Sequence, residues 1–483
     1  MFACLTMFSI CQLFVIVITL LIVYFYHKRS KYPPGPFPIP LLGNLPHFVI
    51  NYIFYGESLG DVIIRWKKRF GGTFTIWFGP IPTVAVADYD IAVQTYVRDG
   101  DTQILRYNIP LFKLLREGYG IITSNGDRWL EQRRFALHVL KDFGVGKNLM
   151  EEQILKEFHN RMDPLDEEIQ ANGGKLRLEP RSRFLDVLAG SIINLLMVGY
   201  SFDDSNISEF REMRADIERA LQEFNVLDLA LLNHYTKNLP FMKERYCQVL
   251  EFQNKPIKFI MKQISESEKQ LSIAILDMWQ AGMDTTIATI SWAFAFLVNH
   301  QEVQEKMRQE LWRVVGRNRD VEMSDKVMLP YSSAVVTETH RLSAILTLNI
   351  WRETTKDCFI GGHHVPKGTA NAIMLSALFK DDSVFSNPKE VSKDNLAVNY
   401  SVKFNPDRFI NDKNLEQKII PFGLGKRQCL GESLARAELF LIILNVVKSY
   451  RLNDEGGKVE WCNGTEFGFA RVPYPYEVTF EKM

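Results

Sequence analysis

The chain has little cysteine, no net charge and no internal repeats. Its 57 basic and 57 acidic side chains cancel. Binding to nucleic acid needs a basic surplus, so we expect no nucleic-acid partner. Six cysteines in 483 residues, none of them in a Cys-x-x-Cys pair, argue against a disulfide-rich scaffold and against a structural zinc site. No Gly-x-Gly-x-x-Gly motif follows a predicted strand, so no nicotinamide site is predicted within the chain.

Charge is also missing locally, at the N-terminus. Residues 2–26 contain no charged side chain, and Leu13 to Tyr26 are almost wholly Val, Ile, Leu, Phe or Tyr. About 20 helical residues span roughly 30 Å, the thickness of a bilayer core. Basic residues follow at 27–31, which the positive-inside rule places in the cytosol. We therefore predict an uncleaved membrane anchor over 1–26; the alternative is a buried N-terminal helix.

Beyond the anchor, the sequence predicts a linker and one large domain. Residues 27–44 are basic and rich in proline, which predicts a stiff, extended linker. Roughly 150 residues per domain would allow about three domains in a chain of this length. However, no second linker is present, so we predict a single domain over 45–483. Residues 391–403 show neither helical nor strand period and are predicted to be a surface insertion.

The apolar periodicity predicts a mainly α fold with a minor β part. Residues 73–86 alternate around Gly and Pro breaks, which predicts a hairpin. From 125 to 345 apolar residues recur mostly at helical spacing. Strand patterns return briefly at 358–374, and a last helix is predicted over 432–450.

The most informative motif lies at residues 422–431, where five positions match Phe-x-x-Gly-x-Arg-x-Cys-x-Gly. At about 5% per residue, such a match arises by chance roughly once in 3 million starts. Cys429 stands just before a predicted helix, whose dipole and free N–H groups stabilise a thiolate. Arg427, two residues earlier, can pair with a carboxylate in the ligand frame of a metal.

This stretch resembles the haem-binding signature of the cytochrome P450 monooxygenases, in which the cysteine thiolate is the proximal iron ligand. The resemblance implies a cytochrome P450-like fold, haem b as cofactor and Cys429 as the metal ligand. It also implies that Asp284 and Thr285, in Ala-Gly-Met-Asp-Thr-Thr at 281–286, deliver protons to iron-bound dioxygen. Gly282, in the middle of a predicted helix, would let the flat cofactor approach the backbone.

Further motifs extend the resemblance over nearly the whole chain. Glu338-x-x-Arg341 and the later Arg408 correspond to a buried structural triad on the haem side of the fold. By the same resemblance, arginine and tryptophan donors bind the haem propionates, and Phe422 opens the cofactor-binding stretch. These predicted cofactor-binding residues are Trp129, Arg133, Arg352, Arg427, Phe422 and Gly282. The predicted substrate pocket comprises Leu111, Phe112, Ala281, Leu346, Leu348 and Ile350.

The resemblance is greatest to the microsomal, drug- and fatty-acid-metabolising branch of animals. It implies oxygen insertion into small apolar substrates at the endoplasmic reticulum membrane, with the catalytic domain facing the cytosol. Electrons would come from a separate NADPH-dependent flavoprotein reductase, with cytochrome b5 as a further partner. A basic face that includes Lys426 suits an acidic reductase, and ordinary surface charge is the alternative.

The chain departs from the family pattern between residues 255 and 281, where it is shorter. This short stretch favours the first of two other functions that stay open. One is a haem-binding but catalytically defective relative, and the other is a reductase-independent isomerase or peroxygenase.

Overall fold

The computed structural model describes 16, 19, 20, 22–142, 148–223, 228, 232–263, 269–385, 403–454 and 471–483. The chain forms two compact units. Unit 1 comprises 1–107, 348–377 and 424–427, and unit 2 comprises 108–347, 378–423 and 428–483. The chain passes from unit 1 to unit 2 within α15 (Leu375–Phe379).

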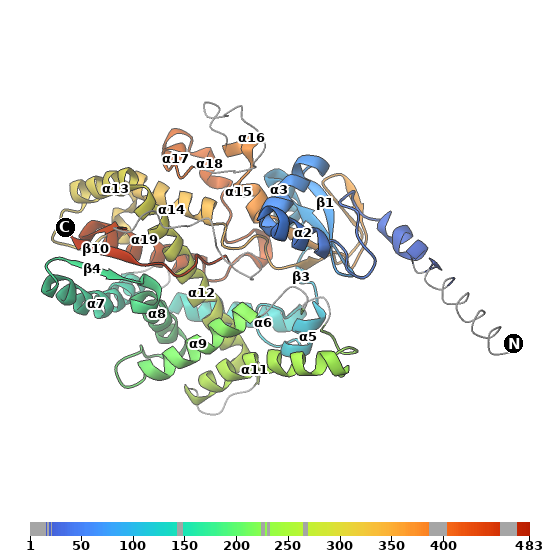
Figure 1. Ribbon diagram of the computed structural model, residues 1–483, viewed down its shortest axis with the longest axis horizontal. Coiled ribbons are helices and arrows are strands. Elements are labelled where there is room, and N and C mark those ends of the chain that lie inside the picture. The colour runs from blue at the N-terminus through green and yellow to red at the C-terminus, as the bar shows by residue number, and fades with distance from the viewer. Residues whose placement is uncertain are drawn as a thin grey trace. The chain divides into compact units, whose positions relative to one another are not determined.

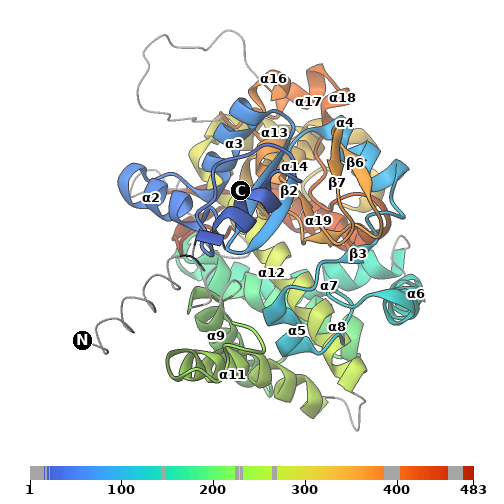
Figure 2. The same ribbon diagram turned by 90° about the vertical axis from the view of Figure 1, so that its right-hand side faces the viewer.

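Unit 1 is built on a five-stranded sheet of order β1-β2-β8-β5-β3. Its strands are β1 (Thr73–Phe78), β2 (Ile81–Val86), β8 (Ala370–Ile373), β5 (Arg352–Glu353) and β3 (Leu105–Arg106). The first two pair antiparallel, from Thr73 opposite Val86 to Phe78 opposite Ile81, which confirms the predicted hairpin. A separate ribbon pairs β6 (Cys358–Ile360) with β7 (His363–Val365) (Figure 2).

The helices of unit 1 are short. They are α2 (Leu45–Tyr55), α3 (Leu59–Phe70), α4 (Tyr89–Val93), the π-helical turn η1 (Gln94–Arg98) and the 3-10 turn η4 (Gly425–Arg427). Ser58 begins α3 with a capping box: its hydroxyl accepts from the Asp61 N–H, and the Asp61 carboxylate accepts from the Ser58 N–H. This exchange satisfies donors that the first helical turn leaves free. The helix then buries Val62, Ile63 and Trp66.

Unit 2 is mainly helical and contains the larger apolar core. Its long helices are α6 (Gly126–Asp142), α7 (Asn148–Ala171), α8 (Asp186–Val198), α9 (Ile207–Glu223), α11 (Pro240–Gln263), α12 (Lys269–Asn299), α13 (Gln301–Val314), α14 (Pro330–Ser343) and α19 (Glu432–Ser449), and the shorter α5 (Pro110–Arg116) precedes them. Short elements are η2 (Arg181–Leu185), η3 (Met323–Met328), α16 (Asp382–Phe385), α17 (Asp407–Asn411) and α18 (Asn414–Gln417). The 31-residue α12 runs through the core beside α8, α14 and α19 (Figure 1).

A small sheet completes unit 2. Its strands β4 (Lys175–Leu178), β10 (Val478–Lys482) and β9 (Tyr450–Asn453) lie in the order β4-β10-β9. Both pairings are antiparallel. The predicted mainly α fold with a minor β part is therefore confirmed for the part of the chain that the structure describes.

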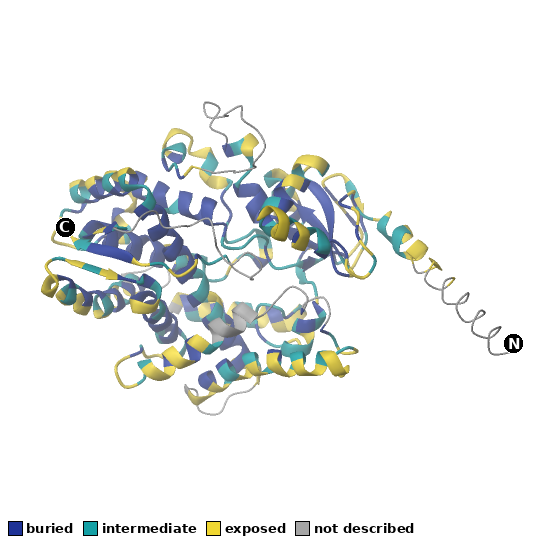
Figure 3. Cartoon of the chain, viewed as in Figure 1, coloured by how far each residue is buried: buried dark blue, intermediate teal, exposed yellow. Residues whose placement is uncertain are grey.

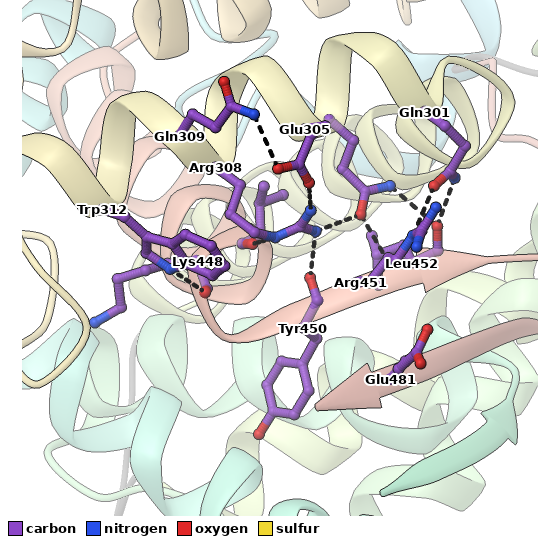
Figure 4. A network of polar contacts seen from close by, with 12 residues as sticks. Gln301, Glu305, Arg308, Gln309, Trp312, Lys448, Tyr450, Arg451, Leu452 and Glu481 are labelled. Atoms are coloured by element: carbon purple, nitrogen blue, oxygen red, sulfur yellow. Dashed lines mark hydrogen bonds and ion pairs between the residues drawn. The ribbon is translucent and has the colours of Figure 1, made fainter. Parts of the chain in front are cut away.

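A polar network holds the end of α19 against α13 (Figure 4). The last carbonyl groups of a helix have no partner within it. Here the Arg308 guanidinium donates to the carbonyl oxygens of Val447 and Tyr450, each at 3.0 Å, and the Trp312 indole donates to that of Lys448 at 3.1 Å. Arg308 is buried, and its charge also complements the negative end of the α19 dipole.

Two structural observations bear on the predicted membrane anchor. Residues 22–29 are helical, so the helix continues beyond the predicted boundary at 26, and most of 1–21 lies outside the described residues. Among the described residues one helix, α12, is long and apolar enough to span a bilayer, but 78% of its apolar window is buried, as expected for a core helix. The predicted insertion 391–403 lies outside the described residues except for Lys403.

Candidate active site

Cys429 lies in a turn of unit 2 that leads into α19. Its N–H donates to the Phe422 carbonyl oxygen at 2.9 Å, which closes the turn over the glycine-rich segment. Gly431 is the N-cap residue of α19, and the helix begins at Glu432. The sequence motif therefore places the thiol just before the positive end of an 18-residue helix, where a thiolate is stabilised.

The groups around the Cys429 thiol have opposing effects on its pKa. Burial by the surrounding polypeptide raises the pKa, although the side chain stays accessible to solvent. The Gly431 N–H, which donates to the sulfur, lowers the pKa. The Glu432 carboxylate raises it and the Arg133 guanidinium lowers it. Together these groups raise the pKa of the Cys429 thiol, chiefly through burial, and the Gly431 N–H and the Arg133 guanidinium partly offset that effect.

Trp129 and Arg133 lie together on α6 of unit 2. The Arg133 guanidinium is 5.9 Å from the centre of the Trp129 ring. Burial lowers the pKa of Arg133, and the nearby Cys429 raises it. The i,i+4 spacing of this pair thus places one aromatic and one cationic side chain on the same face, within electrostatic reach of the cysteine.

Phe422 contacts two side chains that the sequence analysis did not identify. Its ring meets His340 edge to face, with centroids 5.6 Å apart, and the Arg436 guanidinium lies 4.9 Å from its centre. Burial, and then the charge of Arg436, lower the pKa of His340 to about 3. The imidazole is therefore neutral at physiological pH. The signal in the sequence was the position of His340 inside Glu-x-x-Arg, next to Arg341.

Asp284 and Thr285 follow one another on α12, but their side chains have different partners. The Arg214 guanidinium of α9 donates to the Asp284 carboxylate at 2.5 Å. The Thr285 hydroxyl donates to the Ala281 carbonyl oxygen, one turn back, at 2.7 Å. Sequence reasoning missed Arg214. It stands with buried Phe210 and Met213 on one face of α9, and a charged residue on an apolar face signals a buried partner.

Gly282 lies against a neighbouring helix. A Cβ atom at this position would come within 2.8 Å of Ile193 Cδ1 on α8. The glycine therefore allows α8 and α12 to pack closely, a physical reason that the sequence analysis did not consider. Its predicted contact with a cofactor stays a prediction.

Glu338, Arg341 and Arg408 form a buried ionic cluster in unit 2. Arg341 donates to both Glu338 oxygens, at 2.7 and 2.8 Å, and Arg408 donates to one of them at 3.1 Å. The remaining guanidinium donors reach backbone carbonyl groups, such as that of Phe379 at 3.1 Å from Arg341. The structure thus brings together the three residues of the predicted triad.

Unit 1 carries the other two predicted propionate donors. Arg352 donates to the Leu424 carbonyl oxygen at 2.6 Å and lies over the Tyr96 ring. Arg427 donates to the Ile104 carbonyl oxygen at 2.7 Å. Gly425, with φ of 72°, passes so close to the Tyr96 carbonyl oxygen that a Cβ atom would lie 1.8 Å from it. The absence of a side chain at Gly425 therefore allows this close backbone contact within unit 1.

Comparison with known proteins identifies the family. The cytochrome P450 family model matches residues 33–274 and 265–480. The chain belongs to the cytochrome P450 family. It is 32% identical to cytochrome P450 2H2 of Gallus gallus over 486 residues, which cover 94% of each chain. It is 29% identical to cytochrome P450 2A6 of Homo sapiens, also over 94% of each chain.

A nematode relative is similar over nearly the same share of the chain. Probable cytochrome P450 cyp-35D1 of Caenorhabditis elegans is 27% identical over 504 residues, covering 95% of this chain and 97% of the relative. The resemblance stated from the motifs is thereby confirmed, including its animal branch, because the vertebrate relatives are named as P450 2-family members.

The residues of unit 2 fit a haem-thiolate centre. A P450 haem takes one protein ligand, a cysteine thiolate, and Cys429 offers an accessible sulfur with a backbone donor and Arg133 close by. Among the described residues no cluster of three His, Cys, Asp or Glu side chains can hold a metal ion.

The predicted pocket residues are divided between the units. Leu111 is buried, Phe112 and Leu346 are half-buried, and Ala281 is exposed; all four belong to unit 2. Leu348 and Ile350 belong to unit 1. Arg471, which sequence analysis missed, holds the segment before Leu346: its N–H donates to the Ile345 carbonyl oxygen at 2.7 Å and its guanidinium to that of Ser343 at 2.9 Å.

Proposed function

We propose that the chain is a haem-thiolate monooxygenase that inserts one oxygen atom of O2 into small apolar substrates such as xenobiotics, fatty acids or steroids. An N-terminal anchor over 1–26 would hold it in the endoplasmic reticulum membrane, with the domain 45–483 in the cytosol. A separate NADPH-dependent flavoprotein reductase would supply the electrons, with cytochrome b5 as a second donor. The observation that carries the proposal is the accessible Cys429 thiol before α19, with Arg133 and the Gly431 N–H facing it.

Haem, when bound, supplies the iron at which dioxygen is reduced and activated. Cys429 would hold its iron through the thiolate sulfur, and Trp129 and Arg133 would bind a propionate. Arg352 and Arg427 of unit 1 are proposed to share that task, because a guanidinium binds a carboxylate through two parallel hydrogen bonds. The buried cluster of Glu338, Arg341 and Arg408 would keep its own unit rigid around the cofactor.

Asp284 and Thr285 would transfer the protons that the reaction consumes. One oxygen atom enters the substrate and the other leaves as water, which consumes two electrons and two protons. The Thr285 hydroxyl, now bonded to the Ala281 carbonyl oxygen, can donate a proton and recover one. The Asp284 carboxylate, held by Arg214, can accept a proton from solvent and pass it on. The presence of this pair favours the reductase-dependent reaction over a peroxygenase or an isomerase.

Thiolate ligation can be tested with the full chain, produced together with a reductase. We expect the reduced, carbon-monoxide-treated protein to show the red-shifted Soret band of a thiolate-bound ferrous haem. Cys429→Ala should abolish this band, whereas Cys247→Ala, which removes an exposed thiol on α11, should leave it unchanged. An unchanged spectrum in Cys429→Ala would refute the ligand assignment.

Monooxygenation needs a second measurement, because a defective relative would also show the band. Incubation with NADPH, reductase and 18O2 should yield products that carry one heavy oxygen atom, in a screen of lipids and drug-like compounds. A normal band without any NADPH-dependent product would favour the defective relative, and products formed with peroxide alone would favour the peroxygenase.

A further inference from the structure

A chain of hydrogen bonds links four polar side chains inside unit 1. The Tyr96 hydroxyl donates to the Asn371 side-chain oxygen at 2.9 Å, and the Asn371 amide donates to the Gln103 side-chain oxygen, also at 2.9 Å. The Gln103 amide then donates to the Cys358 sulfur at 3.6 Å. All four side chains are buried, within a sheet whose strand β1 Figure 3 shows in the colour of buried residues. Buried polar groups need partners, and a network in which each has one fixes their orientation.

The Tyr96 side chain is neutral in this network. Burial raises the pKa of Tyr96, and the nearby Arg352 lowers it by a smaller amount, so the phenol keeps its proton at physiological pH. A phenolate at this position would form an ion pair with Arg352 and compete with any other anion for the guanidinium. The neutral ring contacts the cation without adding a negative charge beside it.

The Tyr96 ring lies against Arg352. The Arg352 guanidinium is 4.6 Å from the centre of the ring, and the residue is 1% exposed. An aromatic face attracts a cation most strongly where water is excluded. Arg352 on β5 also stands directly opposite Asn371 on β8 in the antiparallel strand pair. Asn371 therefore lies across from the arginine on the neighbouring strand and binds the ring that the arginine contacts.

The backbone of Tyr96 contacts the second segment that unit 1 contributes to the site. Tyr96 lies in the π-helical turn η1, a rare conformation that often marks functional sites. Its carbonyl oxygen is the atom that Gly425 approaches closely, and the Leu424 carbonyl oxygen accepts from Arg352. One tyrosine thus contacts Arg352 with its ring and the glycine-rich segment with its main chain.

We propose that Tyr96 is a positioning residue that acts through Arg352: its ring, held by the hydrogen bond to Asn371, orients the Arg352 guanidinium for a haem propionate. The inference rests on the proposed role of Arg352 as a propionate donor. A carboxylate binds a guanidinium at its edge through two parallel N–H groups, so the plane of the guanidinium decides whether both bonds form. The ring acts on the face of the guanidinium instead, so it orients the cation without competing with the carboxylate.

The test is a double-mutant cycle on the full chain with bound haem, using Tyr96→Leu, Arg352→Gln and the two combined. Resonance Raman spectra of the ferric protein measure the propionate bending bands, which report hydrogen bonds to the carboxylates. The rate of haem transfer to an excess of apomyoglobin is the second measurement. We expect each single variant to shift a propionate band. Tyr96→Leu should also speed haem transfer about tenfold, as the loss of a buried cation–π contact implies.

Coupling between the two residues decides the result. Because Tyr96 acts through Arg352, adding Tyr96→Leu to Arg352→Gln should neither shift the band further nor speed the transfer again. Equal effects of Tyr96→Leu with and without Arg352 would show a merely structural role and overturn the inference. Tyr55→Leu is the matched control, because Tyr55 is 73% exposed on α2 of the same unit; it should change neither measurement.

A conservative variant keeps the test decisive if Tyr96→Leu yields too little protein. Tyr96→Phe retains the ring and removes only the hydroxyl that binds Asn371. It should shift the same propionate band by a smaller amount, and only when Arg352 is present. An unshifted band in Tyr96→Phe would overturn the role given to the hydrogen bond with Asn371.

Two further outcomes separate this inference from the proposed function. A band that Arg352→Gln does not shift would refute Arg352 as a propionate donor and the inference with it, while the carbon monoxide spectrum would still show a thiolate-bound haem. A shift in Arg352→Gln without one in Tyr96→Leu would overturn the inference alone and leave the proposed function intact.

Discussion

Glu338 and Glu438 are both buried carboxyl groups of unit 2, and their surroundings are opposite in kind. Glu338, on α14, accepts hydrogen bonds from Arg341, Arg408 and the Asn405 N–H. Glu438, on α19, accepts one from the Thr286 hydroxyl at 3.1 Å, and burial raises its pKa to about 8. The first carboxylate is neutralised by two cations, whereas the second is neutralised by its own proton.

The comparison shows two ways in which one core can hold an acidic residue. A buried carboxylate with cationic partners is costly to disturb, because removing one partner leaves an uncompensated charge. A buried carboxyl group without a cation avoids the charge by staying protonated. The first arrangement makes stability depend on both arginines. The second makes it depend on pH.

The largest expected effect is that of Arg341→Ala. Breaking a buried ion pair costs about 3–5 kcal/mol, so we expect little or no protein with bound haem in cells that produce the wild type well. The measurement is the yield of the carbon monoxide band per milligram of purified chain. Arg313→Ala, an exposed arginine on α13, is the matched control. A normal yield from Arg341→Ala would show that the cluster is dispensable.

Glu438→Gln is expected to change the free energy of unfolding by a smaller amount and in the opposite direction, so that the chain becomes more stable. Because the folded state binds the Glu438 proton more tightly than the unfolded state, wild-type stability falls as pH rises from about 4.5 towards 8. The fall by pH 7 is roughly 2–3 kcal/mol. Glu438→Gln removes this loss, so the variant should resist urea better than the wild type at pH 7 and about equally at pH 4.5.

The matching substitution Glu338→Gln sharpens the contrast. It leaves Arg341 and Arg408 without their anion and should destabilise the chain at both pH values. Urea titrations monitored by the haem absorbance provide the comparison. If the two glutamine variants changed stability in the same direction, the proposed difference between the two sites would be wrong.

The smallest effect is predicted for Thr286→Val. The Thr286 hydroxyl lowers the pKa of Glu438, so its removal should raise that pKa further and extend the decline in stability to higher pH. Loss of one hydrogen bond costs about 1 kcal/mol. Urea midpoints from pH 5 to pH 9 would reveal the shift. The double variant with Glu438→Gln should no longer show it.

Motifs with fixed spacing predicted much of the candidate site. Cys429 was recognisable because five constrained positions surround it, and Glu338 and Arg341 because i,i+3 residues share a helix face. The pairing of Arg214 with Asp284 was not predictable, since it joins residues 70 apart through the packing of α9 on α12. For the same reason the contact of Gly282 with Ile193 could not be foreseen. Helical and strand periods predicted the elements, but not which faces meet.

The order of strands in the small sheet has a consequence for synthesis of the chain. β10 lies between β4 and β9 and is translated after both of them. The sheet can therefore assemble only once residue 482 has left the ribosome. Until then two strand edges of the nascent chain can pair wrongly. Premature termination shortly before β10 should thus yield an aggregating product rather than a slightly shortened enzyme.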